Sequence, residues 1–232
     1  MKHIASCIFL FFITSCASTA YFSGQEMGAS THIEINENRL IYSGEITKEA
    51  NQKLFQVYES QEKKPTILSI NSKGGDIYDG VELGTWVFDN NISVFIDNIC
   101  ASSCANYVFP AAKRKILLKN SILVWHGSTF QKSMDDRVRE GHKGFLALRK
   151  KEEIFFKKIH VDYRITIYGI DKIEQHHFWY ASLFNKTMAG FDYSLKDLRK
   201  FGITGIILED KEWDWRRYSS GNAYVVRVKV SL

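Results

Sequence analysis

One stretch decides the fold: Thr66-Ile67-Leu68-Ser69-Ile70-Asn71-Ser72-Lys73-Gly74-Gly75-Asp76. Its first half is an apolar run with β-branched residues, which predicts a buried strand over 66–71. Two glycines then permit a sharp turn, and the segment 76–89 carries apolar residues at mostly helical spacing. A strand, a glycine turn and a helix in this order predict one βα unit of an α/β protein.

The elements on either side repeat this alternation. Alternating or β-branched runs predict strands at 32–35, 39–43 and 92–96, and the segment 47–60 predicts a helix with one apolar face and Thr47 as its N-cap. The order βαβαβ favours a parallel or mixed sheet with right-handed crossovers and helices on its faces. In such folds the chemistry gathers where strands end and helices begin.

Later segments extend the pattern. Residues 103–112 predict a helix, 122–125 an apolar strand, and 131–171 a long amphipathic helix or a helix pair rich in charged residues. Residues 223–230 alternate enough for a late strand, which we expect at a sheet edge where Arg227 and Lys229 would discourage stray pairing.

Composition narrows the class of protein. The chain has 232 residues, of which 45% are hydrophobic, so it has enough apolar surface for a core without a metal or a disulfide scaffold. The formal charge of +5, from 31 basic and 26 acidic residues, is mixed along the chain rather than blocked. We therefore expect no nucleic-acid partner.

The N-terminus predicts export. Met1-Lys2-His3 is positively charged, and the apolar run 4–13 is too short to span about 30 Å of hydrocarbon as a helix. The run ends in Ile13-Thr14-Ser15-Cys16, which resembles a bacterial lipobox, where the Cys thiol is acylated before the preceding peptide is removed. Ordinary cleavage after Ala20, which would release a soluble protein, is the alternative.

We therefore expect a lipoprotein-type signal peptide over 1–15, a small polar tether over 16–31 and a single domain over 32–232. Acyl chains on Cys16 would anchor the protein to a membrane. This places the body in the bacterial cell envelope, at the outer membrane or the periplasmic face. Both cleavage alternatives place it outside the cytosol.

Three short segments could carry chemistry. Gly74-Gly75 could aim backbone N–H groups at an oxyanion, Ser102 follows a strand at the start of a helical run, and His126 ends an apolar strand. Taken singly, each has an ordinary structural interpretation: a plain turn, a helix N-cap and a hydrogen-bonded structural histidine. Together they supply a hydroxyl, a base and donors for an oxyanion, which are the parts of nucleophilic catalysis.

The same segments carry a family resemblance. Asn71-Ser72-Lys73-Gly74-Gly75, Cys100-Ala101-Ser102, and the run from Asn120-Ser121 to His126 resemble, in this order, the ClpP/crotonase superfamily, and most closely exported relatives of the proteolytic subunit of Clp protease. The resemblance implies an α/β fold of ClpP/crotonase-like ββα units, with a mostly parallel sheet and a long helical segment. Lys73 replaces the usual Pro of this family.

The resemblance also implies site roles. Ser102 would be the nucleophile, His126 the general base and then acid, and the backbone N–H groups of Gly74 and Ser103 the oxyanion hole. A slip of the alignment by one residue would make Ser103 the nucleophile instead. The third member would be an acid after the long helical segment, for which we choose Asp192 over Asp197, and a Ser/His dyad remains open.

The cysteines within the domain leave two states open. Cys100 and Cys104 could form a disulfide in an oxidising compartment, but helical side-chain directions would strain it, so packed thiols are favoured. Their spacing is a poor zinc site, and we expect no metal and no cofactor. His160 and the pair His176-His177 are interpreted as solvated surface residues.

These observations lead to three hypotheses. The first is an exported, lipid-anchored serine hydrolase acting on peptide or other acyl bonds. The second is a catalytically inactive lipoprotein of the same fold that serves as a binding or assembly module, and the third is a crotonase-like acyl-thioester enzyme. The family resemblance also implies a homo-oligomer, since the corresponding helix builds rings in that family.

Overall fold

The structure is a computed structural model that describes residues 31–219 and 221–231. The predicted signal peptide, the predicted lipidation site Cys16 and the predicted tether up to residue 30 lie outside the described residues. In the part that is described, no helix is both long enough and apolar enough to cross a membrane.

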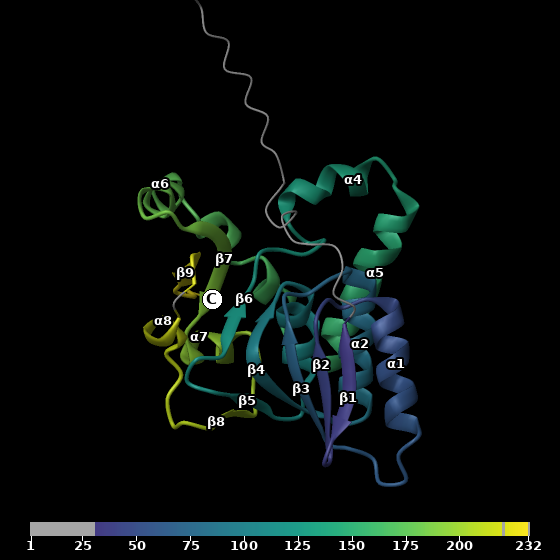
Figure 1. Ribbon diagram of the computed structural model, residues 1–232. Helices are drawn as coiled ribbons and strands as arrows, with labels where there is room; N and C mark the ends of the chain where they lie inside the picture. Colours follow the sequence, from purple (N-terminus) through teal and green to yellow (C-terminus); the bar gives the residue numbers. More distant parts are fainter. Residues whose placement is uncertain (1–30, 220, 232) are drawn as a thin grey trace, which may run out of the picture.

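A seven-stranded sheet forms the centre of the molecule, with the order β1-β2-β3-β4-β5-β8 and with β6 also paired to β4 (Figure 1). Only β1 runs antiparallel to its neighbour, and the remaining pairs of this sheet are parallel. The predicted mostly parallel α/β sheet is therefore confirmed. Its strands are β1 His32–Asn36, β2 Arg39–Ser43, β3 Ile67–Ser72, β4 Ser93–Ala101, β5 Lys115–Leu117, β6 Ile122–Val124 and β8 Ile206–Leu208.

Three helices pack along one side of this sheet (Figure 1): α1 Lys48–Glu59, α2 Ile77–Asp89 and α5 Lys143–Ile159. The predicted cap is confirmed, because the Thr47 side chain accepts a hydrogen bond from the Ala50 amide at 3.2 Å. Asp76 caps α2 in the same way and accepts from two amides of its first turn. Sequence-local signals therefore fix where both crossover helices begin.

The charged segment 131–171 is a helix pair followed by short 3₁₀ turns. Helix α4 Asp135–Arg139 precedes α5, and Gly141 between them adopts a φ of +73°. A positive φ is incompatible with a right-handed helix, so the helix is interrupted here, and glycine adopts this conformation without steric cost. Short elements complete the chain: η1 Cys104–Val108, α3 Phe109–Ala111, η2 Lys132–Met134, η3 Tyr163–Thr166, η4 Ile170–Lys172, α6 Gln175–Leu183, α7 Leu195–Lys200 and α8 Trp215–Tyr218.

The late strand forms and lies at a sheet edge, as expected. β9 Ala223–Val228 pairs in parallel with β7 Thr187–Tyr193 in a separate two-stranded sheet. The guanidinium of Arg227 also forms an ion pair with the buried Asp192 at 2.7 Å. That contact was not predicted, since an alternating pattern cannot identify a buried partner from a distant strand.

Trp125 joins the small sheet to the large one. Its backbone exchanges two hydrogen bonds of 2.8 Å with Phe191 of β7, and its indole is fully buried. The ring packs against Phe109 and Tyr193, with centroids 6.2 and 5.3 Å away. The residue that follows Trp125 is consequently held where the two sheets meet.

Candidate active site

The candidate residues emerge at one end of three adjacent parallel strands. Ser72, at the end of β3, is level with Cys100 of β4, and Ala101 of β4 is level with Val124 of β6. The chain segments that carry Gly74, Ser102 and His126 therefore leave the sheet at the same edge. This carboxyl edge of a parallel sheet is where α/β proteins usually place their ligands.

Ser102 occupies a strained turn between β4 and the following helix. Its φ is +54°, its amide donates to the Val124 carbonyl at 3.0 Å, and its carbonyl accepts from the Asn106 amide at 2.8 Å. A helix N-cap has an extended backbone, so the N-cap interpretation of Ser102 does not fit this geometry. A half-exposed serine on a left-handed strand-to-helix turn is instead the arrangement of a nucleophile elbow.

Gly74 lies directly against this turn. Its φ is +99°, and a Cβ atom added to it would lie 2.6 Å from Ser102 Cβ and 2.9 Å from the Ser103 nitrogen. Both the backbone conformation and the space therefore require glycine. The neighbouring hydroxyl of Ser103 donates to the Gly75 carbonyl at 2.8 Å, which fastens the glycine loop to the start of the helix.

The proposed oxyanion donors are in different states. The Gly74 amide donates to Ser72 Oγ at 3.0 Å, so an oxyanion would have to displace that hydroxyl. On the other side of the loop, the Ile46 amide donates to the Gly74 carbonyl, and the Ile46 carbonyl accepts from the Asp76 amide. In this parallel bridge the N–H and C=O of Gly75 itself point away from Ile46. Since the Gly75 carbonyl meets Ser103, its amide is directed to the same side, an additional donor that the motif did not single out.

His126 is positioned by its two neighbours in sequence. Trp125 is bonded to Phe191, and the Gly127 carbonyl accepts from Asn106 Nδ2 at 2.8 Å. The His126 side chain is exposed, yet desolvation by the surrounding protein lowers its pKa below the ordinary 6.5. At neutral pH the imidazole is therefore neutral and able to accept a proton.

Ser102 and His126 lie on adjacent strand ends. The amide of Ser102 is bonded to Val124, two residues before His126. Across residues 31–219 and 221–231, no hydrogen bond is formed by the Ser102 hydroxyl, so the structure shows adjacency rather than a closed serine–histidine contact. Such contacts are often long before substrate binds.

Asp192 is held by cations. Its fully buried carboxylate accepts from Arg216 at 2.6 and 2.7 Å, from Arg227 at 2.7 and 3.0 Å and from Trp215 Nε1 at 3.0 Å. These contacts saturate both oxygens and do not support the choice of Asp192 as the group that orients His126. The spacing to a Phe-Gly pair could not reveal two arginines that arrive from later elements.

Asp197, the second choice, lies in the first turn of α7. Its carboxylate accepts from Ser194 Oγ, from Lys200 Nζ and from the Val230 amide. Burial alone would raise the pKa of Asp197, but these hydrogen bonds outweigh it and lower the pKa. Both acids therefore have structural partners of their own.

Cys100 and Cys104 form a disulfide that brackets Ser102, with their Cα atoms 5.2 Å apart. The favoured expectation of packed thiols was wrong, because it assumed helical geometry between the two residues. In the structure, Cys100 lies in β4 and Ser102 is left-handed, so only Cys104 lies in a helix, the π-helix η1. The turn thus brings the two sulfurs together.

Sequence reasoning missed a buried acid that contacts the helix after this turn. Glu152 of α5 is fully buried and accepts hydrogen bonds from Tyr107, at 2.5 Å, and from Thr129. Burial raises the pKa of Glu152. A signal was present, since Glu152 lies four residues after Leu148 and four before Phe156, on the apolar face of α5.

Comparison with known proteins bears on the fold. No family model matches this chain, and no curated protein matches it. Solved structures similar to it include a point mutant of ClpP1 from Listeria monocytogenes, at 15% identity and a TM-score of 0.44, covering 75% of this chain and 93% of that one. A peptidase from Plasmodium falciparum matches at 18% identity and a TM-score of 0.39, covering 53% of this chain and 78% of that one.

A ClpP is therefore among the solved structures to which this chain is similar. At these identities the likeness concerns the fold alone. The functional argument below depends on the contacts of the chain's own residues.

Proposed function

We propose that this chain is an extracytoplasmic serine hydrolase that cleaves peptide or other acyl bonds, with Ser102 as the nucleophile and His126 as the general base. One observation carries the proposal: Ser102 adopts a φ of +54° on a strand-to-helix turn, in contact with a glycine loop and beside the strand that leads to His126. A left-handed L-residue costs roughly 1–2 kcal/mol. This conformation directs the chain sharply from β4 into the following helix and leaves Ser102 half-exposed at the turn.

The proposed reaction proceeds by acyl transfer. Ser102 Oγ attacks the substrate carbonyl carbon while His126 takes the hydroxyl proton. The Ser103 amide and an amide of the Gly74-Gly75 loop donate to the resulting oxyanion. His126 then gives its proton to the leaving group as the scissile bond breaks, and water, activated by the same imidazole, hydrolyses the acyl-serine ester and regenerates the hydroxyl.

A fluorophosphonate probe tests the nucleophile. We expect the probe to form a covalent adduct at Ser102 of the wild type and none at that site in Ser102→Ala. Ser103→Ala tests the alternative nucleophile. It removes the adjacent hydroxyl and its hydrogen bond to Gly75 but leaves the backbone amide, so the adduct at Ser102 should still form. Two results would exclude this assignment: no labelling of the folded wild type, or labelling that is lost in Ser103→Ala and kept in Ser102→Ala.

A second candidate, a binding module without catalysis, is favoured by one contact. The Gly74 amide already donates to Ser72 Oγ, which occupies a donor that the reaction would use. In that case a gene encoding Ser102→Ala would restore the wild-type phenotype to a deletion strain completely. A hydrolase predicts no restoration by Ser102→Ala and restoration by Ser103→Ala.

The placement outside the cytosol is supported by the Cys100–Cys104 disulfide, since such bonds persist in oxidising compartments. The proposal includes lipid attachment at Cys16. Cys16→Ser should then abolish labelling with a palmitate analogue and move the protein from the membrane fraction to the soluble fraction. Unchanged fractionation and labelling would contradict the lipid anchor.

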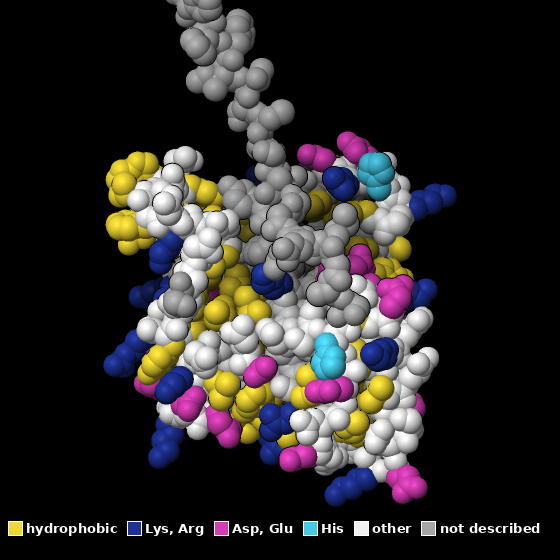
Figure 2. Space-filling model, viewed as in Figure 1, with side chains coloured by type: hydrophobic (Ala, Val, Ile, Leu, Met, Phe, Trp, Pro, Cys, Tyr) yellow, Lys and Arg dark blue, Asp and Glu magenta, His cyan; other side chains and the backbone are white. Residues whose placement is uncertain are grey.

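We also propose that the protein forms a homo-oligomer. Large apolar side chains of α6 and the residue after it are exposed, and Figure 2 shows hydrophobic side chains gathered at the upper left, where α6 lies in Figure 1. Trp179 and Leu183 are 66% and 61% exposed, which is unusual for a monomer. Sedimentation velocity should show an oligomer that Trp179→Glu dissociates, and a wild-type monomer would refute it.

A further inference from the structure

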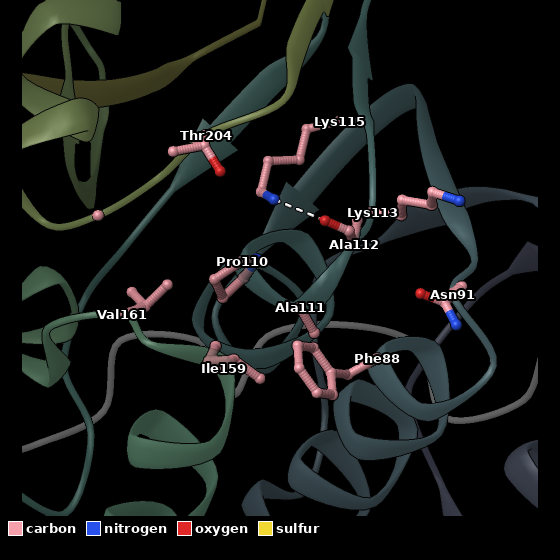
Figure 3. A pocket seen from close by; sticks show the side chains of 11 residues that line it. Phe88, Asn91, Pro110, Ala111, Ala112, Lys113, Lys115, Ile159, Val161 and Thr204 are labelled. Atoms are coloured by element: carbon pink, nitrogen blue, oxygen red, sulfur yellow. Dashed lines mark hydrogen bonds between the residues drawn. The ribbon is translucent and has the colours of Figure 1, made fainter.

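A pocket, seen from close by in Figure 3, lies where β4 and β5 begin. Ser102 follows the other end of β4. β4 begins beside it and ends at Ala101, so the two places are separated by the length of that strand, about 25 Å. The pocket has a volume of about 150 Å³, which accommodates a ligand of benzene size. It is lined by Phe88, Asn91, Pro110, Ala111, Ala112, Lys113, Lys115, Ile159, Val161, Gly202 and Thr204.

Lys115 is the unusual member of this lining. It is the first residue of β5, its side chain is only 4% exposed, and its Nζ donates to the Ala112 carbonyl at 2.6 Å. An ammonium has three donors, and within the described chain this is its one hydrogen bond. Desolvation lowers the pKa of Lys115 to about 8. A buried cation without an anion is costly, so the site gains from a negatively charged partner.

The rest of the pocket supplies no such partner from the described chain. None of its lining residues is acidic, and Lys113 is the other charged side chain. Asp89 lies between the lining residues Phe88 and Asn91 in sequence, and its carboxylate forms an ion pair with Lys158 of α5 at 2.6 Å. His160, between two lining residues of the α5 end, is exposed. The pocket is therefore basic.

The walls are apolar on the side away from Lys115. Phe88, Ile159 and Val161 contribute these walls, and Thr204 lies on the Lys115 side in Figure 3. A doubly charged ligand such as phosphate would place charge against hydrocarbon, which is unfavourable. A single carboxylate with a short hydrocarbon body matches both halves of the pocket.

We propose that this pocket binds a small organic monocarboxylate, with the carboxylate paired to Lys115 Nζ and the hydrocarbon body against Phe88, Ile159 and Val161. The binding is non-covalent and independent of the hydrolase proposal. The carboxylate binds the ammonium form, so affinity falls as pH rises above the pKa of Lys115. Lys113, His160 and the Asp89–Lys158 pair are the other titratable groups around the pocket.

Butyrate is a suitable probe, and butyramide is its neutral counterpart of the same shape. Calorimetric titration of the full chain at pH 7 should show butyrate binding at least about tenfold more tightly than butyramide, which is the worth of one charge-assisted hydrogen bond. Lys115→Met keeps an unbranched apolar side chain, one atom shorter than lysine, and removes the charge, so it should lose about tenfold or more of the butyrate affinity.

Lys113→Met is the matched control, because it removes an exposed lysine from the same pocket and should change butyrate affinity by less than about threefold. Circular dichroism and the melting temperature report whether each variant is folded. Equal affinity for butyrate and butyramide, equal butyrate affinity of wild type and folded Lys115→Met, or no binding to the wild type would each overturn the proposal.

Discussion

At the scale of single residues, the site depends on two left-handed conformations that face each other. Gly74 has a φ of +99° and Ser102 a φ of +54°. A Cβ atom added to Gly74 would lie 2.6 Å from the Cβ atom of Ser102. The glycine pair and the serine could be recognised from the sequence. Their backbone angles, and the Ser72 hydroxyl bonded to the Gly74 amide, could not, because these depend on contacts between separate strands.

Gly74→Ala should disable the site while the fold persists. The new methyl group meets Ser102 Cβ, and alanine is strained by about 1–2 kcal/mol at positive φ. We expect fluorophosphonate labelling to fall more than tenfold, together with a lower melting temperature. Gly144→Ala in α5 is the control, since nothing lies within 4 Å of its new Cβ and alanine favours helix. Normal labelling of Gly74→Ala would contradict this account of the turn.

The pH dependence of hydrolysis should report His126. Desolvation lowers the pKa of His126 below 6.5, and a general base works in its neutral form. The acid limb of kcat/KM should therefore have its midpoint below pH 6.5, with activity falling as pH drops through it. His176→Gln removes an exposed histidine and should leave this limb unchanged. A midpoint above 6.5 would mean that another group controls the rate.

At the scale of elements, the regular βα units were predictable and the irregular ones were not. The helices near 48–59 and 77–89 follow from apolar periodicity and from caps adjacent in sequence. The three-residue strands β5 and β8 are too short to show a period, and they form because each lies beside a neighbour that is distant in sequence. The π-helix after Ser102 likewise depends on tertiary contacts, among them the Tyr107 bond to Glu152 of α5.

Replacement of Glu152 by glutamine tests that last contact. Burial raises the pKa of Glu152 above its ordinary 4.5, so its contribution to stability is complete below pH 4.5 and is lost as pH rises through the folded-state pKa. Glutamine does not titrate. The free energy of unfolding of the wild type should therefore fall relative to that of Glu152→Gln as the pH rises from 4.5 through the folded-state pKa of Glu152, as measured by urea denaturation.

Glu153→Gln provides the comparison, because Glu153 is exposed on the same helix and its replacement should change the free energy of unfolding by less than about 1 kcal/mol. A wild type that gains stability relative to Glu152→Gln as pH rises would reverse the sign of the argument. It would indicate that the hydrogen bonds from Tyr107 and Thr129 stabilise the ionised carboxylate more than burial disfavours it.

At the scale of the whole molecule, one carboxylate joins the C-terminal elements. Asp192 of β7 holds Arg216 of α8 and Arg227 of β9, and β7 is bridged to Trp125 ahead of His126. The sequence showed only alternation in this region. The small sheet and its ion-pair node could not be predicted, because they bring together residues separated by 24 and 35 positions.

Asp192→Asn separates a structural role from a catalytic one. Removing the charge leaves two arginines without their acid, which should lower the free energy of unfolding by about 3 kcal/mol. Labelling of Ser102 in the folded protein should stay within about tenfold of the wild type, since loss of a triad acid costs about 10⁴. Asp89→Asn, in an exposed pair with Lys158, should cost less than about 1 kcal/mol.

The facing turns at Gly74 and Ser102 also bear on how such chains diverge. A related protein that no longer uses the Ser102 hydroxyl would no longer require glycine at the position of Gly74. A bulky residue at the position of Gly74, appearing together with loss of the serine, would therefore mark a lineage that has kept the architecture and abandoned the reaction.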